Sequence, residues 1–460
     1  MPAKLKEKWM SNLEKIQGAP RPARFVPSRS ANIGLALGLL LGSAAAASAD
    51  FIAGADFSDV EYFQQSPGLI YRDGGVAQDE PLAILKNHGL TCVRLRLFTS
   101  SAAQAQNNPY NYINNLDYTV PLAVRVKNAG LQLSLDFHYS DTWADPGHQT
   151  KPAAWTNLTF VQLVQQMHDY SSNCIAALDL AGAMPDYVQV GNEITGGMLW
   201  PDGKVPGSNP SLQWSNLAQL MNAAIQGIRD AAGTNMPKII VHIDRGGDWS
   251  TTQWYFDNLI KTQHVQFDII GESFYPFWHG TLSNLATCLT NAAMRYGKPV
   301  VVAETDFPWE YSTNIYGIPA TPAGQVQYLA ALARVVEGVP SGLGGGIFWW
   351  GTEYQPVSGA NQAGFGDRSF FDGTGNVLPI ADAFGQLNVP LTLDASLSGA
   401  NLALSWPLSG AGMGLTSTTG LSASASWVPV TNAVQSSGNI MTVAVPMDAA
   451  QAQFYRLQSK

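Results

Sequence analysis

Eight short apolar runs, separated by longer segments, constrain the fold of this chain more than any other feature of its sequence. Near-continuous stretches of Val, Ile and Leu are typical of strands that are buried on both faces of a parallel sheet. The eight runs are Phe51–Asp56, Thr91–Leu97, Leu131–Phe137, Tyr187–Val190, Lys238–Ile243, Phe267–Ile270, Pro299–Ala303 and Gly346–Trp350. The segments between them show helical periodicity, as in Phe160–Tyr170, Leu212–Ala232 and Ala323–Val336. This alternation of strands and helices predicts an α/β fold, the (β/α)8 TIM barrel.

A doubly wound open sheet is the alternative fold for such a pattern. That fold carries a Gly-rich phosphate-binding loop after its first strand. No such loop follows Phe51–Asp56, which favours the barrel. The composition, 46% hydrophobic and 13% charged with 44 Gly and 27 Pro, fits a large core with many loops. The 13 Trp and 16 Tyr also suit sugar binding, since a pyranose ring packs its apolar face on an aromatic ring.

The first 49 residues have the pattern of a secretory signal peptide. Seven Lys and Arg precede or flank the apolar run Ile33–Leu41, and small residues follow as far as Ala47-Ser48-Ala49, an A-x-A-like cleavage site. The apolar run is too short to span a membrane, although an uncleaved anchor is the alternative. We therefore expect a secreted or periplasmic protein with no membrane partner after cleavage.

Cleavage makes the chain more acidic, because it removes seven basic and two acidic residues and lowers the formal net charge from −9 to −14. Such a chain lacks the positive surface that nucleic-acid binding requires. A neutral polysaccharide is an easier partner than an acidic polymer. We expect a monomer that acts on a polysaccharide and binds no nucleic acid.

The three cysteines give no pattern of a zinc site. Cys92 lies within an apolar run and is expected to be a small buried hydrophobe. Cys174 and Cys288 lie in helix-like stretches and can pair only if the fold brings them together.

The composition changes after about Pro390. The tail is rich in Ser, Thr, Ala, Gly and Val and is nearly free of charge. Leu402–Trp406 and Met441–Val445 alternate apolar with small polar residues, which is typical of antiparallel strands. The predicted parts are a signal peptide (1–49), a barrel domain (50–389) and, joined through Leu387–Pro390, a β-sandwich-like module of unknown role (390–460).

Two glutamates stand at the C-terminal ends of predicted strands. Glu193 ends the stretch Gly191-Asn192-Glu193 after the fourth run, and Glu304 follows the seventh run directly. The C-terminal ends of the strands carry the active site of an α/β barrel. Two carboxyl groups that meet there suit glycoside hydrolysis, with one as proton donor and the other as nucleophile or base. Either glutamate alone fits equally well a structural pair with an arginine or a helix cap.

Further polar and aromatic residues gather at the same strand ends. Arg94 and Arg96 share one face of a strand, so both need carboxylate partners if they are buried, and we expect one to form a structural Arg–Asp pair. Asp136 and His138 share one face of the next strand, before a loop dense in Trp, Tyr and Asp that suits sugar contacts. The other candidate binding residues are Trp143, Asn192, His242, Tyr275 and Trp350.

Two of these candidates have a specific chemical rationale. Asn192 precedes Glu193 and is placed to hydrogen-bond a sugar 2-hydroxyl, a contact that strengthens in the transition state. Tyr275 is placed to donate to the carboxylate of Glu304 and so lower its pKa.

Together these segments resemble the family 53 glycoside hydrolases, the endo-β-1,4-galactanases of the clan A retaining (β/α)8 group. The resemblance spans about Phe51 to Asn388 and does not include the tail. Its most specific piece is Asp136–Pro146, whereas Asn-Glu at a strand end is common to the whole clan. The matching stretches are Gly54-Ala55-Asp56, His88-Gly89 with Val93–Arg96, Asp136–Pro146, Gly191–Glu193, Tyr275-Pro276 and Ala303–Thr305.

The resemblance implies retaining hydrolysis of internal β-1,4 bonds in galactan or type I arabinogalactan, with Glu193 as acid/base and Glu304 as nucleophile. It further implies a cleavage subsite lined by Arg94, His138, Asn192, His242, Tyr275 and Trp350. Trp350-Gly351-Thr352-Glu353 stands where family members usually show Trp-Glu-Pro, so we expect the distal subsites to differ. Some bacterial relatives bind calcium after the nucleophile strand, but Trp309–Thr321 has only Glu310 as an acid, so we expect no metal and no cofactor.

Other functions fit part of the same pattern. Another clan A enzyme, a β-mannanase or a cellulase, shares the glutamates but not the specificity. A catalytically silent carbohydrate-binding barrel is a second alternative, which the presence of both glutamates disfavours. A metal-dependent barrel hydrolase is a poor third, because the histidines are scattered.

Overall fold

A computed structural model describes residues 51–458, except 67, 79, 207–208, 359–363, 423–424, 438 and 448–451. The predicted signal peptide and its cleavage site lie outside these residues. Within the described part of the chain, no helix is both long enough and apolar enough to cross a membrane.

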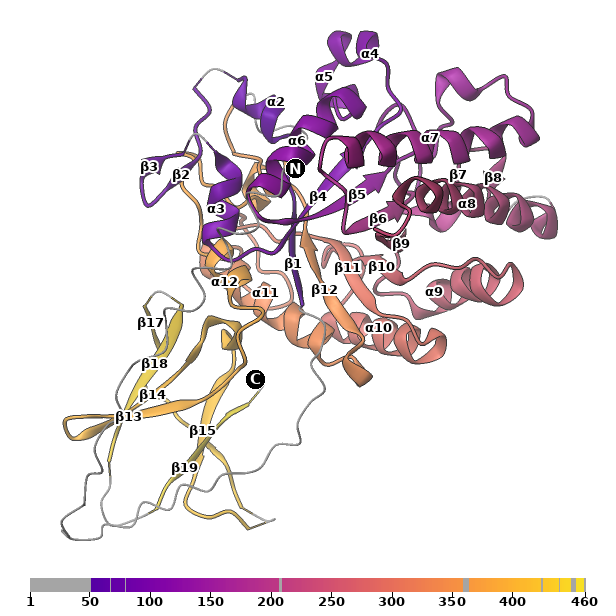
Figure 1. Cartoon of the computed structure of the whole chain (residues 1–460). Helices are drawn as coiled ribbons and strands as arrows, with labels where there is room; N and C mark the ends of the chain where they lie inside the picture. Colours follow the sequence, from indigo (N-terminus) through magenta and orange to yellow (C-terminus); the bar gives the residue numbers. More distant parts are fainter. Residues whose placement is uncertain are drawn as a thin grey trace, which may run out of the picture. The chain divides into compact units, whose positions relative to one another are not determined.

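Eight parallel strands close into a barrel, and helices surround it (Figure 1). Each strand pairs with the next in chain order, and the last strand pairs with the first. The barrel strands are β1 (Ile52–Asp56), β4 (Cys92–Leu97), β5 (Gln132–Phe137), β6 (Tyr187–Val190), β9 (Lys238–Ile243), β10 (Ile269–Ser273), β11 (Val300–Thr305) and β12 (Gly344–Trp349). The predicted TIM barrel is confirmed, and the eight predicted runs are its eight strands.

Three strands have bounds that differ from the prediction by two residues or more. β10 begins at Ile269 and continues three residues beyond Ile270, because Gly271 and Glu272 pair with both neighbouring strands and Ser273 pairs with β11. β11 continues two residues beyond Ala303 and so includes Glu304. β12 begins at Gly344 rather than Gly346, and its glycines allow close packing, since a Cβ on Gly346 would lie 2.4 Å from the Cβ of Ile52. These differences arise because the prediction relied on apolar side chains.

The helices that connect the strands follow from local signals as well as from amphipathic periodicity. Thr159 and Gln162 form a capping box at the start of α7, and Thr281 and Asn284 form one at the start of α10. The main helices are α3 (Pro81–Asn87), α6 (Leu116–Asn128), α7 (Phe160–Leu180), α8 (Pro210–Ala232), α9 (Trp249–Phe256), α10 (Leu282–Tyr296), α11 (Pro322–Glu337) and α12 (Ile380–Gly385). Shorter elements are α2 (Val60–Gln64), α4 (Ala102–Asn107), α5 (Pro109–Tyr112) and the strand pairs β2 (Arg72–Asp73) with β3 (Val76–Ala77) and β7 (Gly197–Met198) with β8 (Gly203–Lys204).

The barrel interior changes from apolar to polar along the strands. Its apolar cluster consists of Ile52, Cys92, Ile240, Ile269, Val301, Ala303 and Phe348. Residues two or four positions later on the same strand face project from the same side. Asp56, Arg94, His242 and Ser273 therefore form a polar layer nearer the C-terminal ends of the strands, and all four are buried.

The cysteine predictions can be compared directly with the structure. Cys92 packs in the apolar cluster of the barrel interior, as expected. Cys174 and Cys288 are both buried and free, so the fold does not pair them.

The tail forms two antiparallel sheets, which confirms the predicted all-β module. One sheet has the order β13 (Asp394–Ser398), β14 (Asn401–Pro407), β18 (Ile440–Pro446) and β17 (Gln435–Ser437). The other has the order β16 (Val428–Pro429), β15 (Gly414–Thr418) and β19 (Phe454–Gln458). Leu404, Trp406, Leu415, Val443 and Val445, from both sheets, share one small core, as in a sandwich. The boundary at residues 389/390 stays a prediction.

His88, in one of the segments of the family resemblance, joins three elements at the edge of the barrel. It caps the C-terminus of α3, and its Nδ1 lies 2.7 Å from Oδ1 of Asp382 in α12. Its Nε2 lies 3.3 Å from Oδ1 of Asp73 in β2. The hydrogen bond to Asp382, followed by the charges of both aspartates, raises the pKa of His88 against the effect of its burial. Both nitrogens donate only in the imidazolium, so the folded protein favours the charged ring.

We expect His88→Gln to lower the melting temperature more at pH 5.5 than at pH 9. A histidine whose pKa is raised by folding contributes stability that is present below its unfolded pKa and is lost as the pH rises through the folded pKa. Thermal unfolding followed by circular dichroism at both pH values measures the difference. His264→Gln is the matched control, because His264 is exposed. An equal loss at both pH values would contradict the charged state of His88.

Candidate active site

A cavity of about 660 Å³ opens at the C-terminal ends of the barrel strands. Its wall contains both candidate glutamates, Glu193 shortly after β6 and Glu304 near the C-terminal end of β11. Five of the eight predicted binding residues also line it, namely His138, Trp143, Asn192, Tyr275 and Trp350. The barrel thus brings together side chains that lie far apart in the sequence, at the position where such folds carry their active sites.

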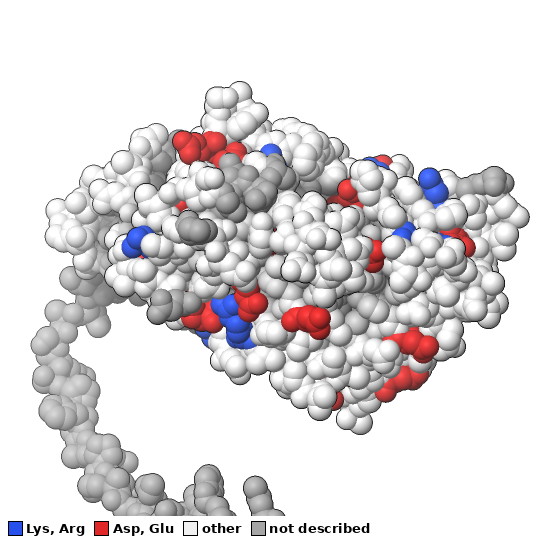
Figure 2. All heavy atoms as spheres, turned by 90° about the horizontal axis from the view of Figure 1, so that it is seen from above, with Lys and Arg blue, Asp and Glu red and all other residues white. Residues whose placement is uncertain are grey.

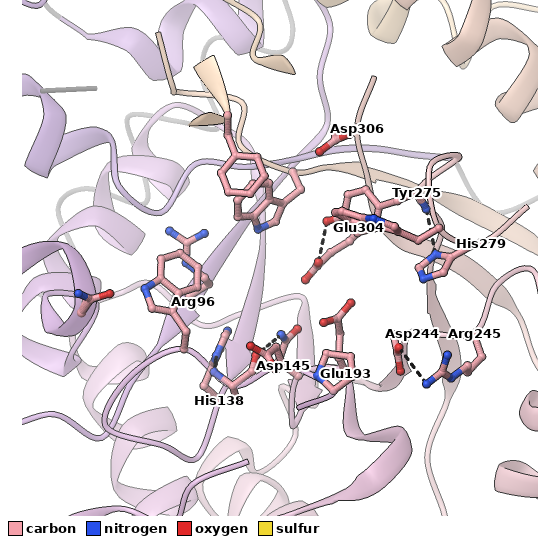
Figure 3. Close-up of a pocket in the computed structure, with 18 of the residues that line it drawn as sticks. Arg96, His138, Asp145, Glu193, Asp244, Arg245, Tyr275, His279, Glu304 and Asp306 are labelled. Atoms are coloured by element: carbon pink, nitrogen blue, oxygen red, sulfur yellow. Dashed lines mark hydrogen bonds and ion pairs between the residues drawn. The ribbon is translucent and has the colours of Figure 1, made fainter. Parts of the chain in front are cut away.

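The two glutamates point toward one another across the cavity (Figure 3). Glu193 follows β6 with a left-handed backbone, φ 49° and ψ 48°, after Gly191 with φ 88°. A non-glycine residue in this region carries strain of order 1 kcal/mol, which the surrounding contacts must offset. This sharp turn at the strand end directs the Glu193 side chain into the cavity.

Glu193 has an environment that favours its protonated form. Its Oε1 lies 2.7 Å from the hydroxyl oxygen of Ser273 on β10. Burial of the carboxyl group, together with the nearby charges of Glu304 and Asp244, raises the pKa of Glu193 well above its ordinary value.

Glu304 has more donors around it. Arg94 Nη2 donates to its Oε1 at 2.8 Å, and the Tyr275 hydroxyl donates to its Oε2 at 2.9 Å. Burial raises the pKa of Glu304, whereas the Arg94 charge and the Tyr275 hydrogen bond lower it. Tyr275 therefore acts on the pKa in the predicted direction, but burial outweighs it. Two donors, Arg94 and Tyr275, hold the carboxylate of Glu304, whereas Glu193 has only the Ser273 contact, so this arrangement favours the proton on Glu193.

Arg94 is the centre of a buried ion-pair network. Its Nη1 donates to Asp56 at 3.1 Å, and its Nη2 donates to Asp136 at 2.8 Å as well as to Glu304. The side chain of Arg94 is only 1% exposed. Its partners lie on β1, β5 and β11, as expected for an interior arginine that needs carboxylates from neighbouring strand ends.

Arg96 forms the predicted structural pair. It donates to Asp56 at 3.2 Å and to Asp59 at 2.5 Å, and its guanidinium lies 4.2 Å from the ring centroid of Trp143. Arg96 thereby stacks on Trp143, and both residues line the cavity.

Three predicted binding residues lie behind the cavity wall. Arg94, Asp136 and His242 are at most 1% exposed, and their polar atoms contact other side chains. His138 lines the cavity, with its Nε2 3.0 Å from Asp136 and its Nδ1 accepting from the Ala144 amide at 2.9 Å. None of these three buried residues lines the cavity. We therefore expect them to hold neighbouring side chains in place rather than to contact substrate.

Aromatic rings form one side of the cavity. The Trp350 ring lies 4.5 Å from Phe365 and 6.5 Å from Trp143, measured between centroids. Trp278, which is 66% exposed, stands at another part of the wall beside Tyr275, at 5.3 Å between centroids. Such faces suit the apolar sides of sugar rings.

Some residues of the site escaped the sequence analysis. Asp244, Trp278, His279 and Asp306 line the cavity but were not selected, and Ser273, which contacts Glu193 from behind the wall, lies beyond the predicted end of its strand. The period of two along Gly271, Ser273 and Tyr275 is a signal that could have revealed Ser273.

Charge around the molecule is sparse. Figure 2 shows one face, on which acidic and basic side chains are scattered among a large majority of uncharged residues. Among the residues that the structure describes, no group of three or more His, Cys, Asp and Glu is arranged to hold a metal ion. The expectation that the protein needs no metal stays a prediction.

The barrel part of the chain is similar to known proteins. The family model of glycosyl hydrolase family 53 matches residues 52–384, so the β module lies outside the match. An uncharacterized protein of Niallia circulans is 39% identical over 71% of this chain and 92% of its own length. The arabinogalactan endo-beta-1,4-galactanase of Humicola insolens is 35% identical over 73% of this chain and 98% of its own. Among solved structures, the family 53 catalytic domain of Ignisphaera aggregans is 32% identical, with a TM-score of 0.66, over 73% of this chain and 95% of its own.

We expect Arg94→Met to destabilise the fold by about 3–5 kcal/mol, because it leaves Asp56, Asp136 and Glu304 buried without this counter-ion. Urea unfolding measures the loss. Arg229→Met is the control, since Arg229 is exposed near the end of α8 and should change stability by less than about 0.5 kcal/mol. A loss below about 1 kcal/mol for Arg94→Met would contradict the central role of this residue.

Proposed function

This chain belongs to glycosyl hydrolase family 53, and we propose that it hydrolyses internal β-1,4-galactosidic bonds of galactan and type I arabinogalactan with retention of configuration. The names of relatives such as the Humicola insolens enzyme support the choice of substrate. The observation that carries the chemistry is the pair of facing carboxyl groups, one favouring the proton and the other held by Arg94 and Tyr275.

The proposed mechanism has two displacements. Glu304 attacks the anomeric carbon while Glu193 gives its proton to the leaving oxygen, which forms a covalent glycosyl-enzyme. Glu193, now ionised, then takes a proton from water as the water attacks the same carbon, and Glu304 is released. Arg94 and Tyr275 hold one carboxylate oxygen each, so they orient Glu304 for attack.

The surrounding residues have matching roles in this proposal. Trp350 and Trp143 form the aromatic wall for the sugar ring that is cleaved. Asn192 donates one amide hydrogen to the Ala144 carbonyl at 2.8 Å, which leaves its second hydrogen for the sugar 2-hydroxyl. Retention requires the carboxyl groups to be about 5–5.5 Å apart, and a crystal structure with a separation beyond about 8 Å would exclude it.

The alternatives differ in substrate or in activity. A β-mannanase or cellulase shares the glutamate pair, and a binding protein with this fold would release no sugar. A reducing-sugar assay on galactan, mannan and cellulose separates all three. We also propose that the protein is exported, on the signal-like leader of its sequence.

We expect Glu304→Ala to lower galactan hydrolysis by at least about 10³-fold with the fold intact, because it removes the nucleophile. Azide should restore part of the turnover on an activated aryl galactoside and give the α-galactosyl azide, since azide occupies the space of the lost carboxylate. Nuclear magnetic resonance of the product identifies the anomer.

Glu310→Ala is the matched control, because Glu310 is an exposed glutamate in the segment that follows β11. Its activity should equal that of the unaltered enzyme. Near-normal hydrolysis by Glu304→Ala would end the assignment of the nucleophile.

We expect kcat/KM to remain high at pH values well above 4.5, the ordinary pKa of a glutamic acid. The acid form of Glu193 is required, and its raised pKa keeps that form populated until the pH exceeds the raised value. Initial rates on galactan between pH 4 and pH 9 test this. A profile that falls as the pH rises through 4.5 would contradict the role of Glu193 as proton donor.

A further inference from the structure

We infer that a chain of hydrogen bonds from Arg94 through Asn192, His242 and Ser273 fixes the catalytic proton on Glu193. The inference rests on the proposed function, because it takes Glu193 as the proton donor. Ser273 and His242 are positioning residues in this scheme, since they act on substrate only through Glu193.

The first link fixes the orientation of the Asn192 amide. Arg94 Nη2, which shares its two hydrogens among several oxygens, lies 2.9 Å from Oδ1 of Asn192, and Gln189 Nε2 lies 3.2 Å from the same atom. A guanidinium can only donate, so this atom of Asn192 must be the acceptor oxygen. The amide nitrogen donates to the Ala144 carbonyl, which excludes the flipped arrangement.

The second link fixes the tautomer of His242. Its Nδ1 lies 3.0 Å from Oδ1 of Asn192, an atom that only accepts, so Nδ1 carries a hydrogen. Burial and the charge of Arg94 lower the pKa of His242 well below its ordinary value, so the ring is neutral. A neutral imidazole has one ring hydrogen, and Nε2 is therefore an acceptor.

The third link fixes the Ser273 hydroxyl. Its Oγ lies 2.8 Å from the unprotonated Nε2 of His242, so its single hydrogen points there. The same Oγ lies 2.7 Å from Oε1 of Glu193 and has no second hydrogen to donate. The hydrogen of that contact must come from the protonated carboxyl group of Glu193.

A count of protons gives the same result. The three contacts, Glu193 to Ser273, Ser273 to His242 and His242 to Asn192, need one hydrogen each. Protonated Glu193, the serine hydroxyl and a neutral histidine supply three, whereas an ionised Glu193 leaves one contact without a hydrogen. Ser273 and His242 are both 0% exposed, so water does not repair the deficit.

Other charged groups also face the cavity around Glu193 and contribute to its titration. Glu304 and Asp244 oppose its ionisation, and Arg94 favours it. The remaining titratable groups of the cavity wall near these residues are His138, Asp145, Arg245, Tyr275, His279 and Asp306. These groups act on the titration of Glu193 through their charges. The chain of hydrogen bonds acts differently, because all its contacts are satisfied only when Glu193 is protonated.

The direct test is the tautomer of His242 in the unaltered enzyme. The whole protein is labelled with ¹⁵N-histidine, and the spectrum of a His242→Gln variant identifies the His242 signals among those of the seven histidines. At a pH where the enzyme is active, we expect a protonated Nδ1 and an unprotonated Nε2. A protonated Nε2, alone or in an imidazolium, would overturn the inference.

A kinetic test measures the effect of the same hydrogen bonds on the titration of Glu193. His242→Phe removes the acceptor, so the Ser273 hydroxyl becomes free to donate to the ionised carboxylate. The alkaline limb of kcat/KM on galactan should then move down by about one pH unit, and adding Ser273→Ala should reverse the movement. An unmoved or raised limb in folded His242→Phe would overturn the inference.

The two tests separate this inference from the proposed function. The ¹⁵N spectrum requires no turnover. It therefore tests the chain of hydrogen bonds even if galactan is not the substrate or if His242→Phe does not fold. If the enzyme hydrolyses galactan but His242 has the opposite tautomer, the proposed function holds and the inferred chain of hydrogen bonds is wrong.

Discussion

The burial of one guanidinium, that of Arg94, is the interaction on which the rest of the site depends. A charge removed from water is tolerated only with close partners, and Arg94 finds carboxylates on β1, β5 and β11. Those strands lie on different sides of the closed barrel. The ion pairs therefore tie the geometry of the site to barrel closure, so the fold and the site are stabilised by the same contacts.

This arrangement gives different environments to two residues of the same type, Glu193 and Glu304. Glu304 contacts the guanidinium and a tyrosine hydroxyl, and both contacts favour its carboxylate. Glu193 contacts the Ser273 hydroxyl, whose hydrogen we propose is directed toward His242. Because Arg94 also orients Asn192, one cation acts on both glutamates, directly on the first and through hydrogen bonds on the second.

Much of the fold was predictable, because buried parallel strands need apolar runs and the sequence contains eight of them. The prediction was wrong at the ends of β10, β11 and β12, where Gly, Ser, Glu and Thr occupy strand positions that side-chain apolarity does not reveal. The two glutamates were predictable as candidates from their places near the C-terminal ends of strands. The sequence did not reveal which of the other residues line the cavity and which lie behind it, since the depth of a side chain depends on packing across the barrel.

The barrel, the two-sheet tail and the two candidate glutamates near strand ends follow from the amino-acid sequence, since periodicity and position along a strand are local properties. The contact of Ser273 with Glu193, and that of Arg94 with Glu304, 210 positions away in the chain, follow from the packing of the barrel. Hydrogen bonds act over about 3 Å, and such distances are set by strand register and barrel closure rather than by neighbouring residues. For that reason the chemistry of the glutamates was visible in the sequence, whereas the groups that control their protons were not.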